Sequence, residues 1–247
     1  MSRKMVKDII KNFATPRIIG CSKNGYTPNL VKRVLKYNVI GFEIRADYLL
    51  IHNSNNLNRT ESMISKSISA VVANLILFTV RSKKEGGEFS DSYRLKESIF
   101  LEFIPWIDIL DIEINELHKY KQLILSAKEE NKCILASFHN FKTVPPINYV
   151  KQLISKAQDL GADFVKIVGT ANTTKELINL IRIQLEYGDS VPLSVMGMGR
   201  FALISRVILS NIGSIWTYGS VGAPTAPNQP TCKQIYKLSK MIFGETK

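Results

Sequence analysis

Cysteine is scarce in this chain, and so are long apolar runs. The 247 residues contain three cysteines, Cys21, Cys133 and Cys232, none of them in a CxxC pair. An odd number without paired spacing favours neither a disulfide framework nor a zinc site. No stretch reaches the roughly 18 apolar residues of a membrane span, and residues 1–13 lack the apolar core of a signal peptide. We therefore expect a protein of the reducing cytoplasm with no membrane partner.

A cluster of positive charge is also missing, although the formal net charge is +12. Lys and Arg occur in ones and twos along the chain, as in Arg3-Lys4, Lys32-Arg33 and Lys83-Lys84. Recognition of a phosphate backbone needs cations gathered on one face or element. The pattern therefore predicts no nucleic-acid partner, but a solvated basic surface that attracts small anionic substrates.

The apolar residues, 45% of the chain, are arranged in a repeating order. Short runs rich in apolar and β-branched residues recur eight times, at 17–21, 39–44, 75–80, 107–114, 132–138, 164–168, 191–195 and 214–218. Stretches with apolar residues at helical spacing lie between them, at 28–37, 95–103, 115–130, 147–160, 174–187 and 201–209. Such alternation implies a parallel α/β fold, and eight units in this length favour one domain, a (β/α)8 TIM barrel over residues 1–247.

Lys166 is the most informative single residue. In such a barrel the active site lies at the C-terminal ends of the strands. The segment GADFVKIV (161–168) has the pattern of a buried strand, yet lysine is rarely buried without a reason. Lys166 could be a rim lysine that reaches solvent. Alternatively, a desolvated amine near other cations has a lowered pKa and can attack a ketone to form an iminium.

His139 ends the fifth predicted strand, in SFHNF (137–141), beside the strand of Lys166. The other two histidines, His52 and His118, fall in a predicted loop and a polar helix. A lone histidine is often structural, but an imidazole at a strand end can transfer protons near neutral pH. We therefore expect an acid–base role for His139.

Charged residues also end the second and third predicted strands. GFEIRAD (41–47) has Glu43, Arg45 and Asp47 at alternate positions, so we expect them to point the same way along one strand. Three charges inside a barrel are costly unless they are paired or used. In FTVRSKKEGGEF (78–89), Arg81 is followed by Glu85 and two glycines. This segment could be an ordinary charged turn or part of the site.

The segment from Met196 to Arg206 gives weaker signals. Its glycines could form a phosphate site after the seventh strand, but they lack the GxGxxG spacing. Arg206 could be a helix-surface charge or a clamp for a carboxylate, and the pattern alone does not decide. We expect packing in the core, an interface or the pocket for Trp106, Trp216, Met196 and Met198.

Six ordered motifs resemble those of the type I 3-dehydroquinate dehydratases over nearly the whole chain. They are Glu-x-Arg-x-Asp (43–47), Thr-x-Arg-x3-Glu-Gly-Gly (79–87), Ser-x-His-x-Phe (137–141), Lys166, Ser205-Arg206 and Ala-Pro-x-Gln (226–229). The resemblance implies dehydration of 3-dehydroquinate in the shikimate pathway, with no cofactor, no metal and a homodimeric assembly. Any one motif is weak, but six in order are specific.

The resemblance also implies residue roles. Lys166 would condense with the ring ketone, His139 would remove the C2 proton and protonate the departing C1 hydroxyl, and Glu85 would orient His139. Substrate binding is implied for Glu43, Arg45, Arg81, Arg206, Thr225, Gln229 and Ser22.

Three positions depart from the family pattern. Thr225 stands where the family often has Ser, and Asn140 where Asp is common. The serine of the first strand could be Ser22, or it could be replaced by Cys21.

Two other functions stay open from the sequence. An aldolase-like Schiff-base barrel would share Lys166 and could use residues 196–200 for phosphate, although Arg206 with Thr225 and Gln229 suits a carboxylate better. A basic nucleic-acid-binding barrel without catalysis is the other, and the scattered charge argues against it.

Overall fold

The computed structural model describes residues 1–51, 57–90 and 92–244, which leaves His52 outside the described residues. Its eight parallel strands form one sheet in the order β7-β6-β5-β4-β3-β2-β1-β8. Each of the eight predicted apolar runs overlaps one strand. The strands are β1 Ile18–Ser22, β2 Val39–Arg45, β3 Leu75–Thr79, β4 Ile109–Glu113, β5 Cys133–Asn140, β6 Phe164–Thr170, β7 Leu193–Met198 and β8 Thr217–Ser220.

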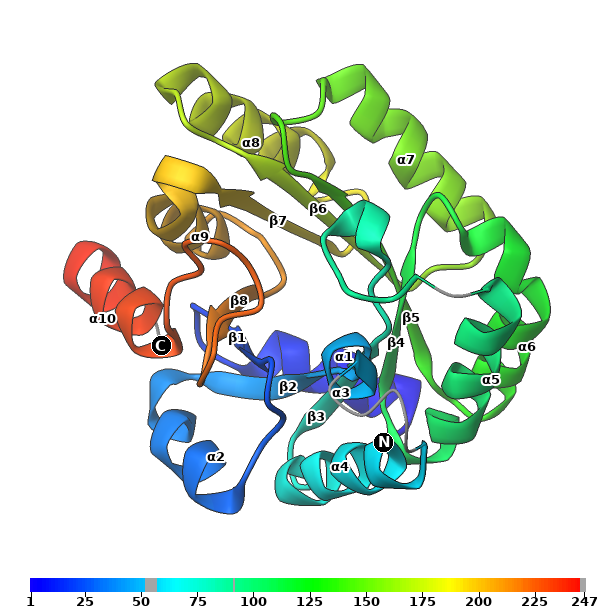
Figure 1. Ribbon diagram of the computed structural model, residues 1–247. Coiled ribbons are helices and arrows are strands. Elements are labelled where there is room, and N and C mark those ends of the chain that lie inside the picture. Colours follow the sequence, from blue (N-terminus) through cyan, green and yellow to red (C-terminus); the bar gives the residue numbers. More distant parts are fainter. Residues whose placement is uncertain (52–56, 91, 245–247) are drawn as a thin grey trace.

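The sheet curls into a nearly closed (β/α)8 barrel (Figure 1), which confirms the predicted fold. β1 pairs with both β2 and β8. At the seam between β7 and β8, the Ile215 amide donates to the Leu193 carbonyl at 2.9 Å. The Ser194 hydroxyl donates to the Trp216 carbonyl, also at 2.9 Å.

Helices follow the strands and cover the outside of the barrel (Figure 1). Each of the six predicted helical stretches overlaps a helix, and α1, α3, α4 and α10 are additional. α8 begins with a reciprocal capping box between Thr173 and Glu176. The helices are α1 Arg3–Asn12, α2 Pro28–Val34, α3 Ala46–Ile51, α4 Leu57–Val71, α5 Tyr93–Phe103, α6 Lys121–Glu129, α7 Ile147–Asp159, α8 Thr174–Tyr187, α9 Ala202–Asn211 and α10 Cys232–Phe243.

Side chains along each strand alternate between two apolar clusters. On β6, Val165 and Ile167 pack in the cluster shared with the surrounding helices. Phe164 and Val168 pack instead in the cluster inside the barrel. Lys166 has the parity of this second pair, so its side chain enters the barrel interior.

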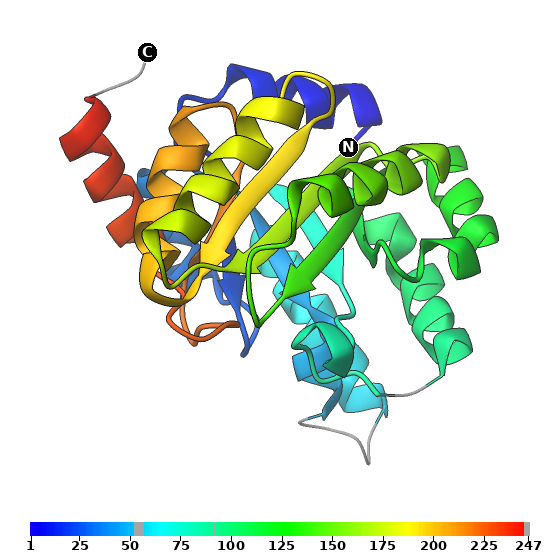
Figure 2. The ribbon, with the colours of Figure 1, turned by 90° about the horizontal axis from the view of Figure 1, so that it is seen from above.

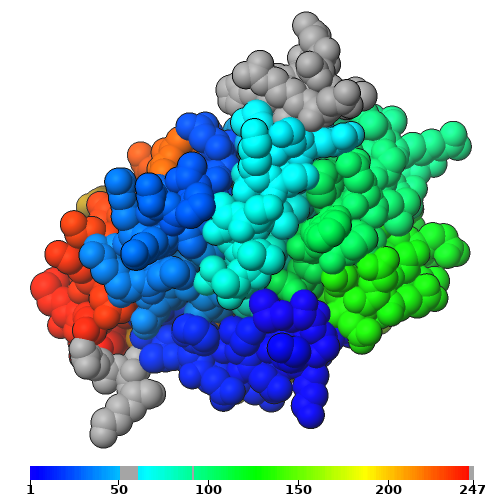
Figure 3. Space-filling model, turned by 90° about the horizontal axis from the view of Figure 1, so that it is seen from below, coloured from blue at the N-terminus to red at the C-terminus, as the bar shows by residue number. Residues whose placement is uncertain are grey.

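Helix α1 covers the end of the barrel at which the strands begin (Figure 2). Its Val6 and Ile10 are buried in the interior cluster. Arg3 and Lys7 form ion pairs with Asp163, whose second oxygen accepts the Ile134 amide at 3.0 Å. Figure 3 shows this dark-blue segment packed against the light-blue, cyan and green parts of the chain. The C-terminal ends of the strands lie at the opposite end of the barrel.

The two tryptophans differ from each other. Trp216 is fully buried in the interior cluster, as expected. Trp106 is 66% exposed, which rules out the core, and its packing in an interface stays a prediction. It follows Pro105 in a short 3-10 turn after α5. Within the described ranges, no helix is both long and apolar enough to cross a membrane.

Candidate active site

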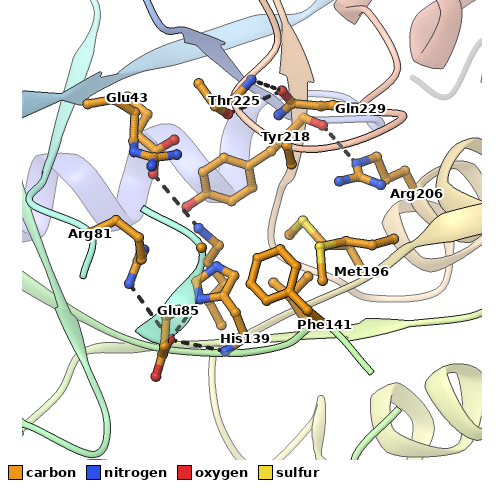
Figure 4. A pocket seen from close by; sticks show the side chains of 16 residues that line it. Glu43, Arg81, Glu85, His139, Phe141, Met196, Arg206, Tyr218, Thr225 and Gln229 are labelled. Carbon is orange, nitrogen blue, oxygen red and sulfur yellow. Dashed lines mark hydrogen bonds and ion pairs between the residues drawn. The ribbon is translucent and has the colours of Figure 1, made fainter. Parts of the chain in front are cut away.

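A pocket opens at the C-terminal ends of the strands (Figure 4). About 470 Å³ of empty space lies within it, part of it open to solvent. Of the predicted site residues, only Ser22 is absent from its lining. The predicted residues that line it are Glu43, Arg45, Arg81, Glu85, His139, Lys166, Arg206, Thr225 and Gln229.

Lys166 is buried among charged and aromatic neighbours, and only 5% of it is exposed. Its Nζ lies 3.8 Å from Glu43 Oε1, 3.7 Å from Asp111 Oδ2 and 4.0 Å from the centre of the Tyr218 ring. No described residue forms a hydrogen bond with this Nζ. Burial lowers the pKa of Lys166, although Glu43 and Asp111 oppose that effect. The rim-lysine alternative is therefore excluded, and the amine is suited to nucleophilic attack.

His139 is paired with Glu85. Glu85 Oε2 lies 2.9 Å from His139 Nδ1 and accepts the His139 backbone amide at 3.1 Å. A carboxyl oxygen at this position favours the tautomer that carries its proton on Nδ1. Nε2 of His139 is then free to accept a proton.

The turn after β3 is built to carry Glu85 to this position. The Ser82 amide at its start donates to Glu113 Oε1 at 2.8 Å. Gly86 has φ 77°, and a Cβ there would lie 2.0 Å from the Phe141 ring. The turn therefore requires glycine at this position.

The pKa values of Glu85 and His139 shift in opposite directions. Burial raises the pKa of Glu85 to about 8, although the guanidinium of Arg81 opposes the shift. Burial and the nearby cations Arg81, Lys166 and Arg45 hold the pKa of His139 well below its usual value. The imidazole is therefore neutral at neutral pH, as a general base must be.

The end of β2 supplies an ion pair to one wall of the pocket. Arg45 binds Asp47 in a two-pronged contact, with Nε–Oδ1 at 2.8 Å and Nη2–Oδ2 at 2.7 Å. Asp47 belongs to α3, so the prediction of three charges along one strand is wrong for this residue. The chain turns into a helix directly after Arg45 and still brings the carboxylate back to the guanidinium. Glu43 remains on the strand and accepts the Thr79 hydroxyl at 3.0 Å.

Arg81 is held by a triangle of hydrogen bonds. Its Nη2 donates to Asp111 Oδ2 and its Nη1 to Ser137 Oγ, each at 2.6 Å. The Ser137 hydroxyl in turn donates to Asp111 Oδ1 at 2.6 Å. This triangle fixes Arg81 with its Nη1 4.0 Å from Glu85 Oε2.

Arg206 is buried, so the helix-surface alternative is excluded. Its Nε donates to the Tyr218 carbonyl at 2.9 Å, and its Nη1 donates to the carbonyls of Gly197 and Ala202 at 2.6 and 2.8 Å. No carboxylate among the described residues pairs with it, and burial lowers its pKa to about 10. An uncompensated buried cation on a pocket wall favours an anionic ligand.

The last loop adds two more polar side chains to the pocket that Arg206 lines. Gln229 Oε1 accepts the Thr225 amide at 2.8 Å and its hydroxyl at 3.2 Å. Thr225 keeps the hydroxyl group that a serine would have at this position. This hydroxyl helps to hold the loop through its bond to Gln229. Gln229 Nε2 has no partner in the described part of the chain and remains available as a donor.

The structure also shows where the departures from the family pattern at the first strand and at Asn140 lie. Cys21 lies in the interior cluster, whereas the Ser22 hydroxyl accepts the Asn24 amide at 3.3 Å, outside the pocket lining. Asn140 accepts the amides of Lys142 and Thr143 at 2.9 and 3.3 Å. Neither Ser22 nor Asn140 joins the other predicted residues.

Two backbone amides of residues 196–200 are already bound within the chain and cannot hold a phosphate. The Gly197 amide donates to Ser205 Oγ at 3.0 Å, and the Arg200 amide donates to Asn172 Oδ1 at 2.9 Å. Met196 and Met198 are buried and line the pocket, as expected.

Asp111 and Tyr218 are the main site residues that sequence reasoning missed. Tyr218 lines the pocket with its ring under the Lys166 amine. Asp111 lies outside the lining and accepts a hydrogen bond from Arg81 Nη2. The segment ILDIE (109–113) does carry a signal for Asp111, because an acidic residue interrupts an apolar strand. Tyr218 shows no such signal, since tyrosine is common in strands.

The arrangement joins a desolvated amine, a neutral imidazole and an uncompensated guanidinium in one pocket. These groups can attack a carbonyl, move a proton and bind an anion. In the described residues, no three His, Cys, Asp or Glu side chains are grouped to hold a metal ion.

Fold and pocket together define a (β/α)8-barrel enzyme. The chain matches the family described as type I 3-dehydroquinase over residues 27–246. It belongs to that family, and its activity is the dehydration of 3-dehydroquinate in the shikimate pathway.

Solved structures of 3-dehydroquinate dehydratases share the fold. The Geobacillus kaustophilus enzyme is 22% identical with a TM-score of 0.77, and the match covers 94% of this chain and 93% of the chain of that enzyme. The type I enzyme of Clostridium difficile, solved with covalently modified comenic acid, is 22% identical with a TM-score of 0.78, covering 92% of each chain. The Aquifex aeolicus enzyme is 24% identical with a TM-score of 0.70, covering 92% of this chain and 97% of its own.

Proposed function

We propose that the chain converts 3-dehydroquinate to 3-dehydroshikimate and water through an iminium on Lys166, with His139 as base and acid. The observation that carries this proposal is the Lys166 amine, which is buried, free of hydrogen bonds to described residues and in the same pocket as His139. No metal or redox cofactor enters the proposed chemistry.

The proposed reaction begins with attack of Nζ on the ring ketone. The C–N bond forms, water leaves, and the resulting iminium draws electrons from the adjacent carbon. Nε2 of His139 removes the C2 proton, and the electron pair moves toward the iminium. The imidazolium then protonates the departing C1 hydroxyl, and hydrolysis of the iminium releases the product and Lys166.

The remaining residues are proposed to bind the substrate. Arg206 Nη2 and Gln229 Nε2 would hold the carboxylate, each with a donor that no described residue occupies. Arg206 supplies one such donor instead of a full guanidinium fork, because Nε and Nη1 bind backbone carbonyls. Glu43, Arg45 and Arg81 also line the pocket, and they would bind the ring hydroxyls and the region of the carboxylate. Ser22 has no proposed contact, because it lies outside the lining.

A turnover assay tests the proposal. The wild type should produce the enone absorbance of 3-dehydroshikimate, and Lys166→Ala should abolish it. His139→Ala should keep the fold and lower kcat by about 100-fold or more, the usual contribution of a positioned acid–base group. Absence of enone with the wild type, or carbon–carbon cleavage in its place, would reject the proposal.

A further inference from the structure

Asp111 is a buried carboxylate with no role in the scheme above. Its side chain is fully buried and does not line the pocket. Even so, Oδ2 lies 3.7 Å from Lys166 Nζ, the atom proposed to bond to the substrate.

The surroundings of Asp111 keep it ionised. Arg81 Nη2 and the Ser137 hydroxyl each donate to it at 2.6 Å. These contacts hold the pKa of Asp111 below its usual value, although burial alone would raise it. A buried negative charge beside Nζ is therefore present throughout the reaction.

The charge on Nζ changes during the proposed reaction. A neutral amine is needed for attack, whereas the iminium carries a positive charge inside a poorly solvated barrel. Two carboxylates lie close enough to balance it, Glu43 at 3.8 Å and Asp111 at 3.7 Å. Glu43 lines the pocket and is exposed to the substrate. Asp111 is behind the wall, where the substrate does not displace it.

We infer that Asp111 is a positioning residue, the fixed counter-ion of the Lys166 iminium and the anchor that holds Arg81 beside Glu85. This inference rests on the proposed function. No bond to Asp111 forms or breaks, and no proton is transferred to it. Its contribution is electrostatic, because a preorganised charge needs no rearrangement when the iminium forms.

Several charged or titratable groups set the pH response of Lys166. They are Glu43 from β2, Arg81 after β3, Asp111 from β4, His139 from β5, Tyr218 from β8 and Cys21 from β1. Removing the charge of Asp111 lowers the pKa of the free amine further. The acid limb of kcat/KM should therefore move to lower pH, even as the iminium becomes less stable.

The experiment compares wild type, Asp111→Asn and a matched control. Asp108→Asn changes another buried aspartate, which lies just before β4 at the far end of the barrel and accepts the Ile76 amide at 2.9 Å. The first measurement is borohydride trapping of wild type with 3-dehydroquinate. If no adduct forms on Lys166, the proposed function itself fails.

With trapping established, D111N should lower kcat by about 100-fold, reduce the trapped fraction at equilibrium and shift the acid limb to lower pH. D108N should leave the acid limb and the trapped fraction unchanged, whatever it does to stability. Wild-type behaviour of D111N overturns the inference. So does a loss of activity in D111N with an unmoved acid limb and trapped fraction, since that result indicates a structural role alone.

If D111N does not fold, the variant Asp111→Glu tests the counter-ion role instead. This variant keeps the charge, so the inference expects a wild-type acid limb and at least about a tenth of wild-type kcat. A fall of about 100-fold or more with the charge retained would overturn the counter-ion role.

Discussion

Most of the buried ionisable side chains of the site contact an ionisable partner. Arg45 is paired with Asp47, Arg81 with Asp111, and Glu85 with His139. Arg206 has no carboxylate partner among the described residues, and this imbalance favours an acidic ligand.

Glu85→Gln should remove one ionisation from the pH profile. The pKa of Glu85 is raised to about 8 by burial, so the carboxyl is mostly protonated at neutral pH and ionises around pH 8. The carboxylate form stabilises the imidazolium that His139 becomes, so wild-type kcat/KM should rise through this range. The variant should lose this rise, and its kcat/KM should fall less than that of His139→Ala. A profile from about pH 6 to about pH 9.5 measures both effects. An unchanged rise near pH 8 in the variant would contradict the role of Glu85.

Arg206→Gln should weaken selection for a carboxylate. A charge-assisted hydrogen bond contributes about 1.5–3 kcal/mol, or roughly 10- to 100-fold in affinity. Wild type should bind a ring analogue with a carboxylate more tightly than the matching carboxamide, and the variant should bind the two about equally. Competitive inhibition constants measure this ratio, which a general loss of stability would not equalise. A ratio unchanged from wild type would reject the contact.

Single residues could be predicted from the sequence where their chemistry conflicts with their surroundings. Lys166 in an apolar strand and His139 at a strand end are of this kind, and both line the pocket. It was harder to predict which side chains of a strand face the barrel interior. Cys21 and Ser22 are neighbours, and only the structure shows which of them faces the barrel interior. Asp47 was singled out in the same motif as Arg45, but its position on α3 depends on a turn that strand alternation does not reveal.

Among the elements, the strands were predicted most completely, because buried parallel strands appear as continuous apolar runs. Helix α1 was missed, since four of its ten residues are lysine or arginine and its apolar face is narrow. Yet that face, with Val6 and Ile10, covers one end of the barrel interior.

Ile10→Ala should therefore destabilise the whole barrel and not α1 alone. Truncating a buried isoleucine costs about 2–5 kcal/mol of unfolding free energy. We expect the lower part of this range, because the end of a helix can relax into the space. The matched control Met5→Ala removes a side chain of the same helix that is 53% exposed, and it should change stability by less than about 0.5 kcal/mol. Urea unfolding of both variants is the measurement, and equal values would contradict the covering role of α1.

The whole molecule combines a rigid barrel with a site assembled from many strands. Lys166, His139 and Arg206 come from β6, β5 and α9, and closure of the barrel brings them to one mouth. The sequence could predict this convergence, because the C-terminal ends of barrel strands share one face. Buried contacts such as those of Asp111 lie below that face and require coordinates.

Three expectations about the whole molecule stay predictions: that it forms a homodimer, that it is cytoplasmic and that it has no nucleic-acid partner. We expect a mass of about twice the 27.9 kDa chain in light scattering after gel filtration, at micromolar concentration and across moderate salt. A single-chain mass under all these conditions would reject the dimer.

The proposed dehydration requires a covalent intermediate on Lys166. Its most direct test is intact-protein mass spectrometry after incubation with 3-dehydroquinate and borohydride, with wild type and Lys166→Ala in parallel. We predict a reduced adduct that maps to Lys166 in the wild type and is absent from the variant. A wild type that turns over substrate without any adduct, or an adduct on another residue, would contradict the account.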